Sequence, residues 1–500
     1  MRRRDLLGGC GAVGAGLLFG RKAWGSPWGA APVGNETLLL PEGVKAESCL
    51  EVFLYGGMST FEGFYVNPEY GKADDPDYKN QQWYLFANDH ASVFRGNCGI
   101  DEADWLSPWK ADSLGNLIHL GPLVMPFRNR PDLLERMRVV VMRHDLEPHE
   151  AAIPLALSGI RLGNPRLCGL GAHVQRYHLD RDTTGRVIPY SYVFTPDGAF
   201  FTDNLQAADT VGLHPGAARP LRIKVGDAYD LPAQLERNVL GTAQPEVDAL
   251  LSWYRNRMNG RYSSGGTPLR APSLSDHDFA LEVLKNVDAL KTVIDEDLLL
   301  PFSSTYCDDG NVNYTGMSLS AAVQLLTDPV APARYVNVID GGLIAADGGG
   351  AFDTHFSHLQ TQARNATNTL QELANLINLP GEGDPNKIDL DKTLVYLSSE
   401  FGRTPVKQGF AGTNHHPHGY VSILLGGPVT ADQSGVIGAI GPDGTASDYV
   451  TPSDMRVALL AALGIYPFTQ ESFAVGDVSN AVDEEGALVW ATEHILGRTL

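Results

Sequence analysis

The chain has 500 residues, of which 43% are hydrophobic and 19% are charged, so it can bury a core large enough for one big domain or two ordinary ones. Lys and Arg number 38 against 59 for Asp and Glu, which gives a formal net charge of −21. This charge argues against a nucleic-acid backbone as a partner, because phosphate contacts need clustered cations.

The N-terminal residues have the pattern of an export signal. Arg2, Arg3 and Arg4 precede an apolar stretch, rich in Gly and Ala, that runs to Phe19. Arginines before a short apolar region are typical of a twin-arginine signal. The stretch is shorter than the roughly 20 residues of a membrane-spanning helix. We assign residues 1–31 to this signal and the N-terminal lead of the mature chain, and expect a periplasmic or extracellular protein without a stable membrane span.

Four cysteines lie beyond this signal and would meet an oxidising compartment after export. Four thiols allow three pairings, and none of them has zinc-finger spacing. Disulfides or buried thiols are therefore expected, rather than metal ligands, for Cys49, Cys98, Cys168 and Cys307.

Apolar runs that end at glycine or polar residues predict the strands of a sheet. In chain order these strands are 50–55, 138–142, 190–194, 221–225, 335–339, 393–397, 420–425 and 436–440. Helices are expected between them, at 122–136, 149–158, 231–300, 359–377 and 453–463. The 359–377 segment is the best marked of these, because its apolar residues recur at three-and-four spacing.

Strands that alternate with helices favour an α/β fold, in which a mainly parallel central sheet is covered by helices on both faces. We expect a single domain over residues 45–475 and a C-terminal extension over 476–500. Two insertions interrupt the domain. Residues 65–117 have no clear periodicity and are expected to cap the site, whereas 231–300 is expected to be largely helical.

Polar residues with metal-binding and anion-binding chemistry follow several strands. Glu400 and Arg403 come directly after the 393–397 strand, and Asp353 and His355 follow a Gly-rich loop. Carboxylates and neutral imidazoles are common metal ligands, and a guanidinium suits a tetrahedral oxyanion. The alternatives are a helix cap made by Asp353 and a structural salt bridge between Glu400 and Arg403. Three histidines within four residues, at 415–418, are harder to explain by packing.

Six motifs in a fixed order then suggest a family. They are GGMSTFE, PHEAAIPLALSG, AFDTHFSH, SSEFGRTP, GTNHHPHG and TPSDMRVALLAALG. With the export signal, they resemble the bacterial exported family called domain of unknown function 1501. That family looks like a branch of the alkaline phosphatase superfamily, alongside sulfatases and cofactor-independent phosphoglycerate mutases. The resemblance implies a three-layer alkaline-phosphatase-like fold that binds one or two divalent metals at the carboxyl ends of the sheet.

The resemblance also implies site residues. His149 and Arg403 would be catalytic, as the acid for the leaving oxygen and as the group that neutralises the transferred charge. The cofactor would be a divalent Zn, Ca, Mg or Mn ion, and its expected ligands are Ser59, Glu62, Asp353, His355, Glu400, Asn414, His415 and His418.

Two departures from the family pattern affect the expected chemistry. Asn414 stands where many relatives have Asp, which removes one negative charge that His416 or His418 would have to replace. Pro148 precedes His149 where relatives often have Ser, and no Ser, Thr or Cys lies between Asp145 and Ile153. Direct attack by water activated on the metal is therefore favoured over a covalent serine mechanism.

The sequence as a whole predicts an exported metal-dependent hydrolase of phosphate or sulfate esters. Its partner would be a small anionic ester or a sulfated or phosphorylated polysaccharide, with aromatic residues of 65–109 available to stack on sugar rings or to pack internally. The alternative is a secreted binding or assembly protein that kept this fold and lost its chemistry.

Overall fold

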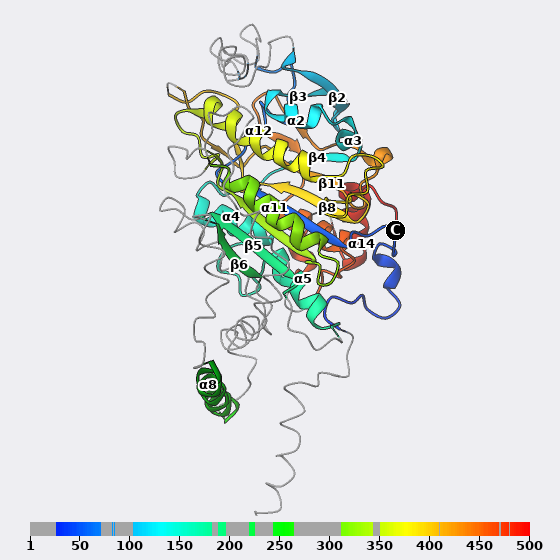
Figure 1. The fold of residues 1–500 in the computed structure, drawn as a ribbon. Coiled ribbons are helices and arrows are strands. Elements are labelled where there is room, and N and C mark those ends of the chain that lie inside the picture. Colours follow the sequence, from blue (N-terminus) through cyan, green and yellow to red (C-terminus); the bar gives the residue numbers. More distant parts are fainter. Residues whose placement is uncertain are drawn as a thin grey trace, which may run out of the picture.

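A computed structural model describes residues 27–71, 83, 85, 104–182, 189–196, 220–225, 244–264, 312–343, 351–409, 411–469, 472–479 and 481–500. At its centre lies an eight-stranded sheet in the order β12-β4-β11-β8-β1-β7-β5-β6 (Figure 1). Its strands are β1 (Ser48–Leu54), β4 (Met137–Met142), β5 (Ser191–Pro196), β6 (Leu221–Val225), β7 (Tyr335–Asp340), β8 (Thr393–Ser398), β11 (Tyr420–Gly426) and β12 (Gly435–Ile437).

The sheet is mainly parallel, as the sequence predicted. Only β11 runs antiparallel to its neighbours, β4 and β8, whereas the other paired strands of the sheet are parallel. The central strands are buried on both faces: every residue of β1 is buried, and so is every residue of β4, β7 and β8. This two-sided burial explains why their sequences read as nearly continuous apolar runs.

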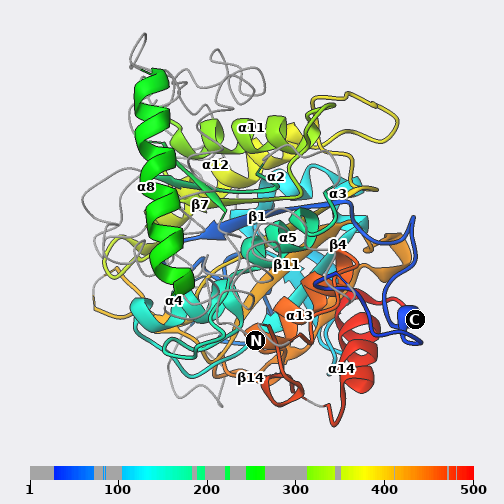
Figure 2. The same cartoon turned by 90° about the horizontal axis from the view of Figure 1, so that it is seen from below.

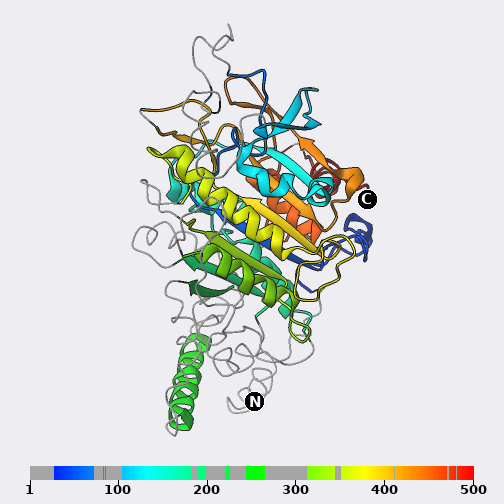
Figure 3. The same cartoon turned by 45° about the horizontal axis from the view of Figure 1, so that its top comes forward.

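Helices cover both faces of the sheet and complete three layers, which Figure 2 shows from below. One face carries α2 (Met125–Arg128), α11 (Tyr314–Thr327) and α12 (His358–Leu376); α11 and α12 lie side by side in Figure 3. The other face carries α4 (His149–Ser158), α5 (Leu170–Leu179), α13 (Pro452–Ala462) and α14 (Glu484–Trp490). Residues of β1 contribute to the core on both faces of the sheet. Leu50 and Val52 belong to a first apolar cluster, which includes Leu370 of α12. Cys49 belongs to a second apolar cluster, which includes Leu459 of α13.

Two expected elements are broken into shorter ones. The strand predicted at 436–440 is interrupted by Gly438, whose φ of 88° lies outside the extended region, so β12 is followed by a separate β13 (Ala439–Ile440) that pairs with β14 (Ala446–Asp448). The helix predicted at 122–136 is instead a 3-10 turn, η5 (Pro122–Val124), followed by α2 and α3 (Pro131–Glu135). Proline falls within the first two positions of each of these segments, where its missing N–H has no helical partner to lose.

The insertion at 65–117 is not wholly irregular. Residues 107–111 form β2 (Ser107–Ala111), which pairs antiparallel with β3 (Leu117–Leu120). Trp83 is fully buried and packs against the aromatic ring of Phe61. This tryptophan therefore packs internally and is not exposed for stacking on a sugar ring. Residues 72–82, 84 and 86–103 lie outside the described residues.

Within 231–300 the structure describes one helix, α8 (Gln244–Ser264), which stands away from the sheet in Figure 3. The rest of that expected helical insertion and residues 1–26 of the expected signal lie outside the described residues. Among the helices that are described, none has the length and hydropathy to cross a bilayer.

The C-terminal residues 476–500 pack onto the domain. Their helix α14 and the π-helical turn η12 (Ala491–Leu496) contact α13 and bury Leu488, Ile495 and Leu496 in the second apolar cluster. They therefore contribute to the helical layer on that face. The remaining short turns are η1 (Glu36–Leu38), η10 (Ala431–Gln433) and η11 (Val475–Asp477).

A buried ion pair ties this helical layer to the sheet. Glu51 of β1 accepts two hydrogen bonds from Arg456 of α13, each 2.6 Å long, and both side chains are at most 2% exposed. Tyr335 and Ser398 donate their hydroxyls to the same carboxylate at 2.6 and 2.7 Å. Every oxygen of Glu51 is thus satisfied, which is the condition under which a buried charge is tolerated.

The cysteines that the structure describes, Cys49 and Cys168, are buried and unpaired, so neither is in a disulfide. Burial raises the pKa of both thiols, which makes them poor nucleophiles at neutral pH. Cys98 and Cys307 lie outside the described residues.

Candidate metal centre

The carboxyl edge of the sheet gathers residues from distant parts of the chain. The strands β1, β7 and β8 end there, and ligand sites in α/β proteins lie at this edge. Because β11 runs in the opposite direction, it starts at the same edge, so the histidine-rich segment that precedes it is brought there as well. Two short strands, β9 (Gly402–Arg403) and β10 (His415–His416), pair with each other and hold the two segments together.

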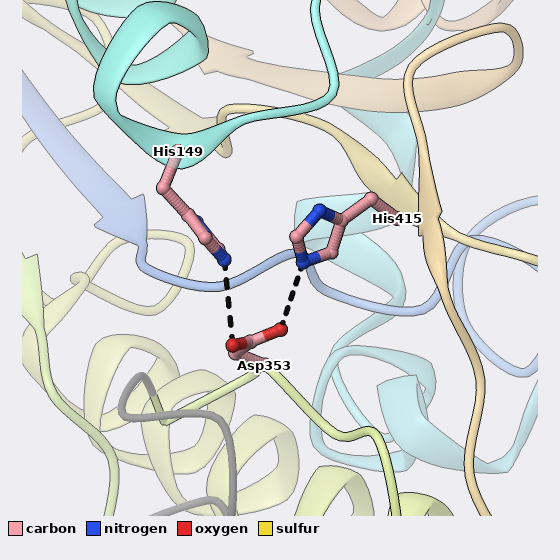
Figure 4. A group of neighbouring side chains, drawn as sticks. All are labelled: His149, Asp353 and His415. Atoms are coloured by element: carbon pink, nitrogen blue, oxygen red, sulfur yellow. Dashed lines mark hydrogen bonds and ion pairs between the residues drawn. The ribbon is translucent and has the colours of Figure 1, made fainter.

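Three side chains meet at this edge and form a possible metal-binding triad (Figure 4). His149, Asp353 and His415 each offer one ligand atom, and these atoms lie within 4.8 Å of one another. His149 Nε2 lies 3.4 Å from Asp353 Oδ2, and His415 Nε2 lies 3.1 Å from Asp353 Oδ1. Metal–ligand bonds of about 2.0–2.2 Å place neighbouring ligand atoms roughly 3.0–3.4 Å apart, which fits both separations.

Each of the two imidazoles is oriented by a hydrogen bond at Nδ1, so that its Nε2 faces the Asp353 carboxylate. His149 Nδ1 lies 2.8 Å from Glu400 Oε1 and His415 Nδ1 lies 2.9 Å from the carbonyl oxygen of Glu147. Carboxylate and carbonyl oxygens accept hydrogen bonds, so each Nδ1 carries the proton, and in the neutral ring each Nε2 then has only a lone pair. His149 Nε2 is buried and has no hydrogen-bond partner in the described structure. Two lone pairs and a carboxylate that converge in this way could hold a divalent metal ion.

The charges around the triad shift the pKa values of its members. Burial alone would lower the pKa of His149, but the carboxylates of Asp353 and Glu400 outweigh it and raise the pKa to about 9. Burial alone would raise the pKa of Asp353, but the adjacent imidazoles of His149 and His415 and the charge of Arg403 hold it well below its usual range. In the metal-free protein a proton on His149 therefore supplies the positive charge at neutral pH.

Glu400, expected as a metal ligand, is not part of the triad and contacts Nδ1 of His149. It is fully buried, and Oε1 accepts hydrogen bonds from His149 and, at 2.8 Å, from the backbone N–H of Gly56. Ser399 donates its hydroxyl to Oε2 at 3.2 Å. A carboxylate behind a histidine in this way fixes the ring orientation of many metal-ligating imidazoles.

Gly56 allows β1 to approach the triad closely. Its φ is 105°, and a Cβ at this position would lie 2.3 Å from the backbone nitrogen of Asp353. No other residue type fits there without displacing the backbone that carries Asp353.

Arg403, expected to bind a substrate oxyanion, is fully engaged by the protein and is 0% exposed. Nε and Nη2 donate to the hydroxyl and the carbonyl of Thr413 at 3.2 and 2.5 Å. Nη1 donates to the Gly56 carbonyl at 3.2 Å and to Asp353 Oδ1 at 2.9 Å, and Nη2 lies 3.5 Å from His355 Nδ1. The five N–H groups of a guanidinium are thereby used within the protein, so in this structure Arg403 positions Asp353.

His355 lies on the exposed side of the triad. Its Nε2 is 3.0 Å from Asp353 Oδ1 and 3.2 Å from His415 Nε2, and its side chain is 31% exposed. Burial, with the nearby charge of Arg403, lowers the pKa of His355, although Asp353 opposes this. A neutral imidazole in this place can serve as a further ligand, as the sequence predicted, or as a group that faces substrate.

Ser59 and Glu62, also expected as ligands, lie in a buried network behind Arg403. Ser59 donates its hydroxyl to Glu62, whose Oε2 lies 3.4 Å from Nε2 of His358. Nδ1 of His358 contacts the hydroxyls of Thr354 and Thr413 at 2.7 and 2.9 Å. The network ends at the hydroxyl of Thr413, which accepts a hydrogen bond from Arg403. It therefore helps to fix the position of Arg403. Sequence analysis missed His358, although it is the last histidine of the AFDTHFSH motif.

Neither Asn414 nor the two later histidines joins the triad. The backbone of Asn414 pairs with Thr404, and the ring of His416 is buried with Nε2 2.8 Å from the carbonyl of Gly444. His418 lines a separate cavity beside His144. Replacement of the missing carboxylate by His416 or His418 is therefore not observed. Sequence analysis also assigned His149 to acid catalysis, whereas the structure places it among the candidate ligands.

Fold and site together define an α/β protein with a candidate metal centre at the carboxyl edge of a mostly parallel sheet. Residues 331–489 match the family model described as Protein of unknown function (DUF1501), which supports the resemblance drawn from the motifs. The matched segment contains Asp353 and His415, whereas His149 precedes it. A search of curated proteins finds no match for the chain.

Proposed function

We propose that the protein is an exported, metal-dependent hydrolase of phosphate or sulfate esters with an alkaline-phosphatase-like fold. The observation that carries the proposal is the convergence of His149 Nε2, His415 Nε2 and the Asp353 carboxylate, with both imidazoles already oriented from behind. The export signal and the order of the motifs support the location and the reaction class.

His149, Asp353 and His415 would hold a divalent ion, with His355 as a further ligand on the exposed side. Two or three imidazoles with one carboxylate favour zinc over magnesium or calcium, which prefer oxygen-only shells. An ion at this position supplies Lewis acidity toward an ester oxygen and lowers the pKa of water.

The other residues keep the ligands in place. Glu400 holds the proton of His149 on Nδ1, and Arg403 holds Asp353 ionised and oriented. The hydroxyls of Thr354 and Thr413 contact His358 Nδ1 and are buried. They are therefore poorly placed as nucleophiles, which supports direct attack by water rather than a covalent intermediate.

Metal content and turnover test the proposal together. Purified protein is treated with chelator, reloaded with zinc or manganese, analysed for metal by mass spectrometry, and assayed with p-nitrophenyl phosphate and p-nitrophenyl sulfate. We expect bound metal and metal-dependent hydrolysis, both lost in Asp353→Asn and in His415→Ala. His494→Ala is the control, since it removes an imidazole of η12, which lies outside the triad. Folded, metal-loaded protein that hydrolyses neither ester, nor other phosphate and sulfate esters, would refute the hydrolase.

One observation favours the second candidate, a secreted binding or assembly protein. Arg403 and the nearby hydroxyls are all committed to protein contacts, which leaves few groups to act on a substrate. Metal-loaded protein that retains a sulfated or phosphorylated polysaccharide but shows no turnover would support this alternative.

A further inference from the structure

A polar cavity lies beside the candidate metal centre. Its volume is 610 Å³, which lies within the range of about 300–1,000 Å³ that is typical of small-molecule sites. It is lined by the loop that follows β4, the end of α4 and the turn that precedes α13. None of the triad residues lines it, so it is a separate site.

The cavity and the centre share a wall. His144 lines the cavity, and its Nε2 lies 2.6 Å from the carbonyl oxygen of Glu400, the residue that orients His149. The backbone N–H of His144 donates to the carbonyl of Pro417, so the loop after β4 is tied to the histidine-rich segment. His418, three residues after the triad member His415, lines the cavity. A ligand in the cavity thus lies next to the residues that support the centre.

The lining carries two arginines and two aspartates, so its formal charge is balanced although the chain as a whole carries −21. Its two carboxylates are already paired, Asp145 with Arg161 and Asp477 with Arg166. Arg143 has no carboxylate partner among the described residues. It donates one hydrogen bond, from Nη1 to a backbone carbonyl, and its guanidinium lies 5.1 Å from the ring centroid of Tyr449. Its remaining N–H groups are available to an anion.

The neutral part of the lining suits a hydroxylated ligand. Asn164 and Ser479 provide an amide and a hydroxyl, and Tyr449 provides an aromatic ring that is 38% exposed. Hydrogen-bonding side chains beside an aromatic ring and a free guanidinium are the groups that recognise a sugar bearing a sulfate or phosphate.

We infer that this cavity binds an anionic sugar unit of the substrate, next to the unit whose ester reaches the metal centre. Arg143 and His418 recognise its sulfate or phosphate group, and Asn164, Ser479 and Tyr449 contact the ring. The inference rests on the proposed function for the link to the ester, but the binding itself needs no turnover.

Calorimetric titration of the full chain, treated with chelator, tests the inference with glucose 6-sulfate, glucose 6-phosphate and uncharged glucose. We expect both anionic sugars to bind at least about tenfold more tightly than glucose, since charge-assisted hydrogen bonds contribute most of the recognition. Arg143→Ala and His418→Ala should each weaken binding of the anionic sugars by about tenfold. Arg143→Lys, which keeps the charge, should recover part of the affinity, and Lys392→Ala, on the opposite edge of the domain, should change nothing.

Asp353→Asn separates this inference from the proposed function. It removes a metal ligand and should leave sugar binding intact. Binding through Arg143 without any ester hydrolysis would uphold the inference and refute the hydrolase. The inference is overturned if no anionic sugar binds, if glucose binds equally well, or if folded Arg143→Ala and His418→Ala proteins bind like the wild type.

Discussion

Glu400→Gln separates an orienting role for Glu400 from a role as metal ligand. Glutamine has the same shape, and its amide oxygen can still accept from His149 Nδ1 and from the Gly56 N–H, as Glu400 Oε1 does at 2.8 Å in each case. Its NH₂ group can donate to the Ser399 hydroxyl, which has a second acceptor in the carbonyl of Leu54 at 2.8 Å. The substitution therefore removes one charge and leaves the packing in place.

The expected loss of metal affinity follows from the single hydrogen bond between Glu400 and His149. A charge-assisted hydrogen bond is worth about 1.5–3 kcal/mol, and partners behind metal ligands typically change metal affinity by roughly 10–100-fold. Zinc affinity, measured by competition with a chromogenic chelator, should fall within this range in Glu400→Gln. Asp353→Asn, which removes the carboxylate of the triad, should fall further, to the level of protein that retains no metal. Equal losses in the two variants would make Glu400 a ligand, and unchanged affinity in Glu400→Gln would remove its orienting role.

Three further predictions concern pH, backbone space and the buried ion pair. Because metal must displace a proton from His149, whose pKa is raised to about 9 in the metal-free protein, zinc affinity should rise about tenfold per pH unit from pH 7 to 9 and then level off; a flat profile from chelator competition would contradict this. Gly56→Ala should lower the free energy of unfolding by about 3 kcal/mol or more, since its Cβ would lie 2.3 Å from a backbone atom. Gly115→Ala, with a similar φ of 85° but open space around it, should lose only about 1 kcal/mol in the same denaturant titration, and equal losses would argue against the steric explanation. Arg456→Met should destabilise by about 3–5 kcal/mol, because it leaves Glu51 buried and unpaired, and the double variant with Glu51→Leu should recover most of that loss; no recovery would mean that the unpaired charge is not the cause.

The strands could be predicted well because the sheet is buried on both faces. The predicted run at 393–397 differs from β8 by a single residue, and 221–225 coincides with β6. Such continuous apolar sequences end where the strand leaves the core. The break at Gly438 could not be predicted, since a positive φ depends on how the chain turns toward β14.

The site could be predicted only in part, because Asp353 and His415 join the triad as expected, whereas Asn414 and His418 do not. Asp353 and His415 stand out in the sequence because polar residues follow strand ends at one edge. Whether Glu400 or Arg403 points into the candidate centre or lies behind it depends on the direction of the side chain and on which donors already form hydrogen bonds. The spacing of residues along the chain gives neither kind of information. His149 was assigned to proton transfer because the sequence does not show that Glu400 occupies its other nitrogen.

The reversed direction of β11 determines when the centre can be assembled. Asp353 lies before β8, His415 lies between β8 and β11, and His149 comes about 200 residues earlier on α4. A ribosome-bound chain that has not yet produced β11 lacks the element that carries His415 back to the others. An ion at the candidate centre could therefore be captured only after β11 has been synthesised, so its insertion would be a late event.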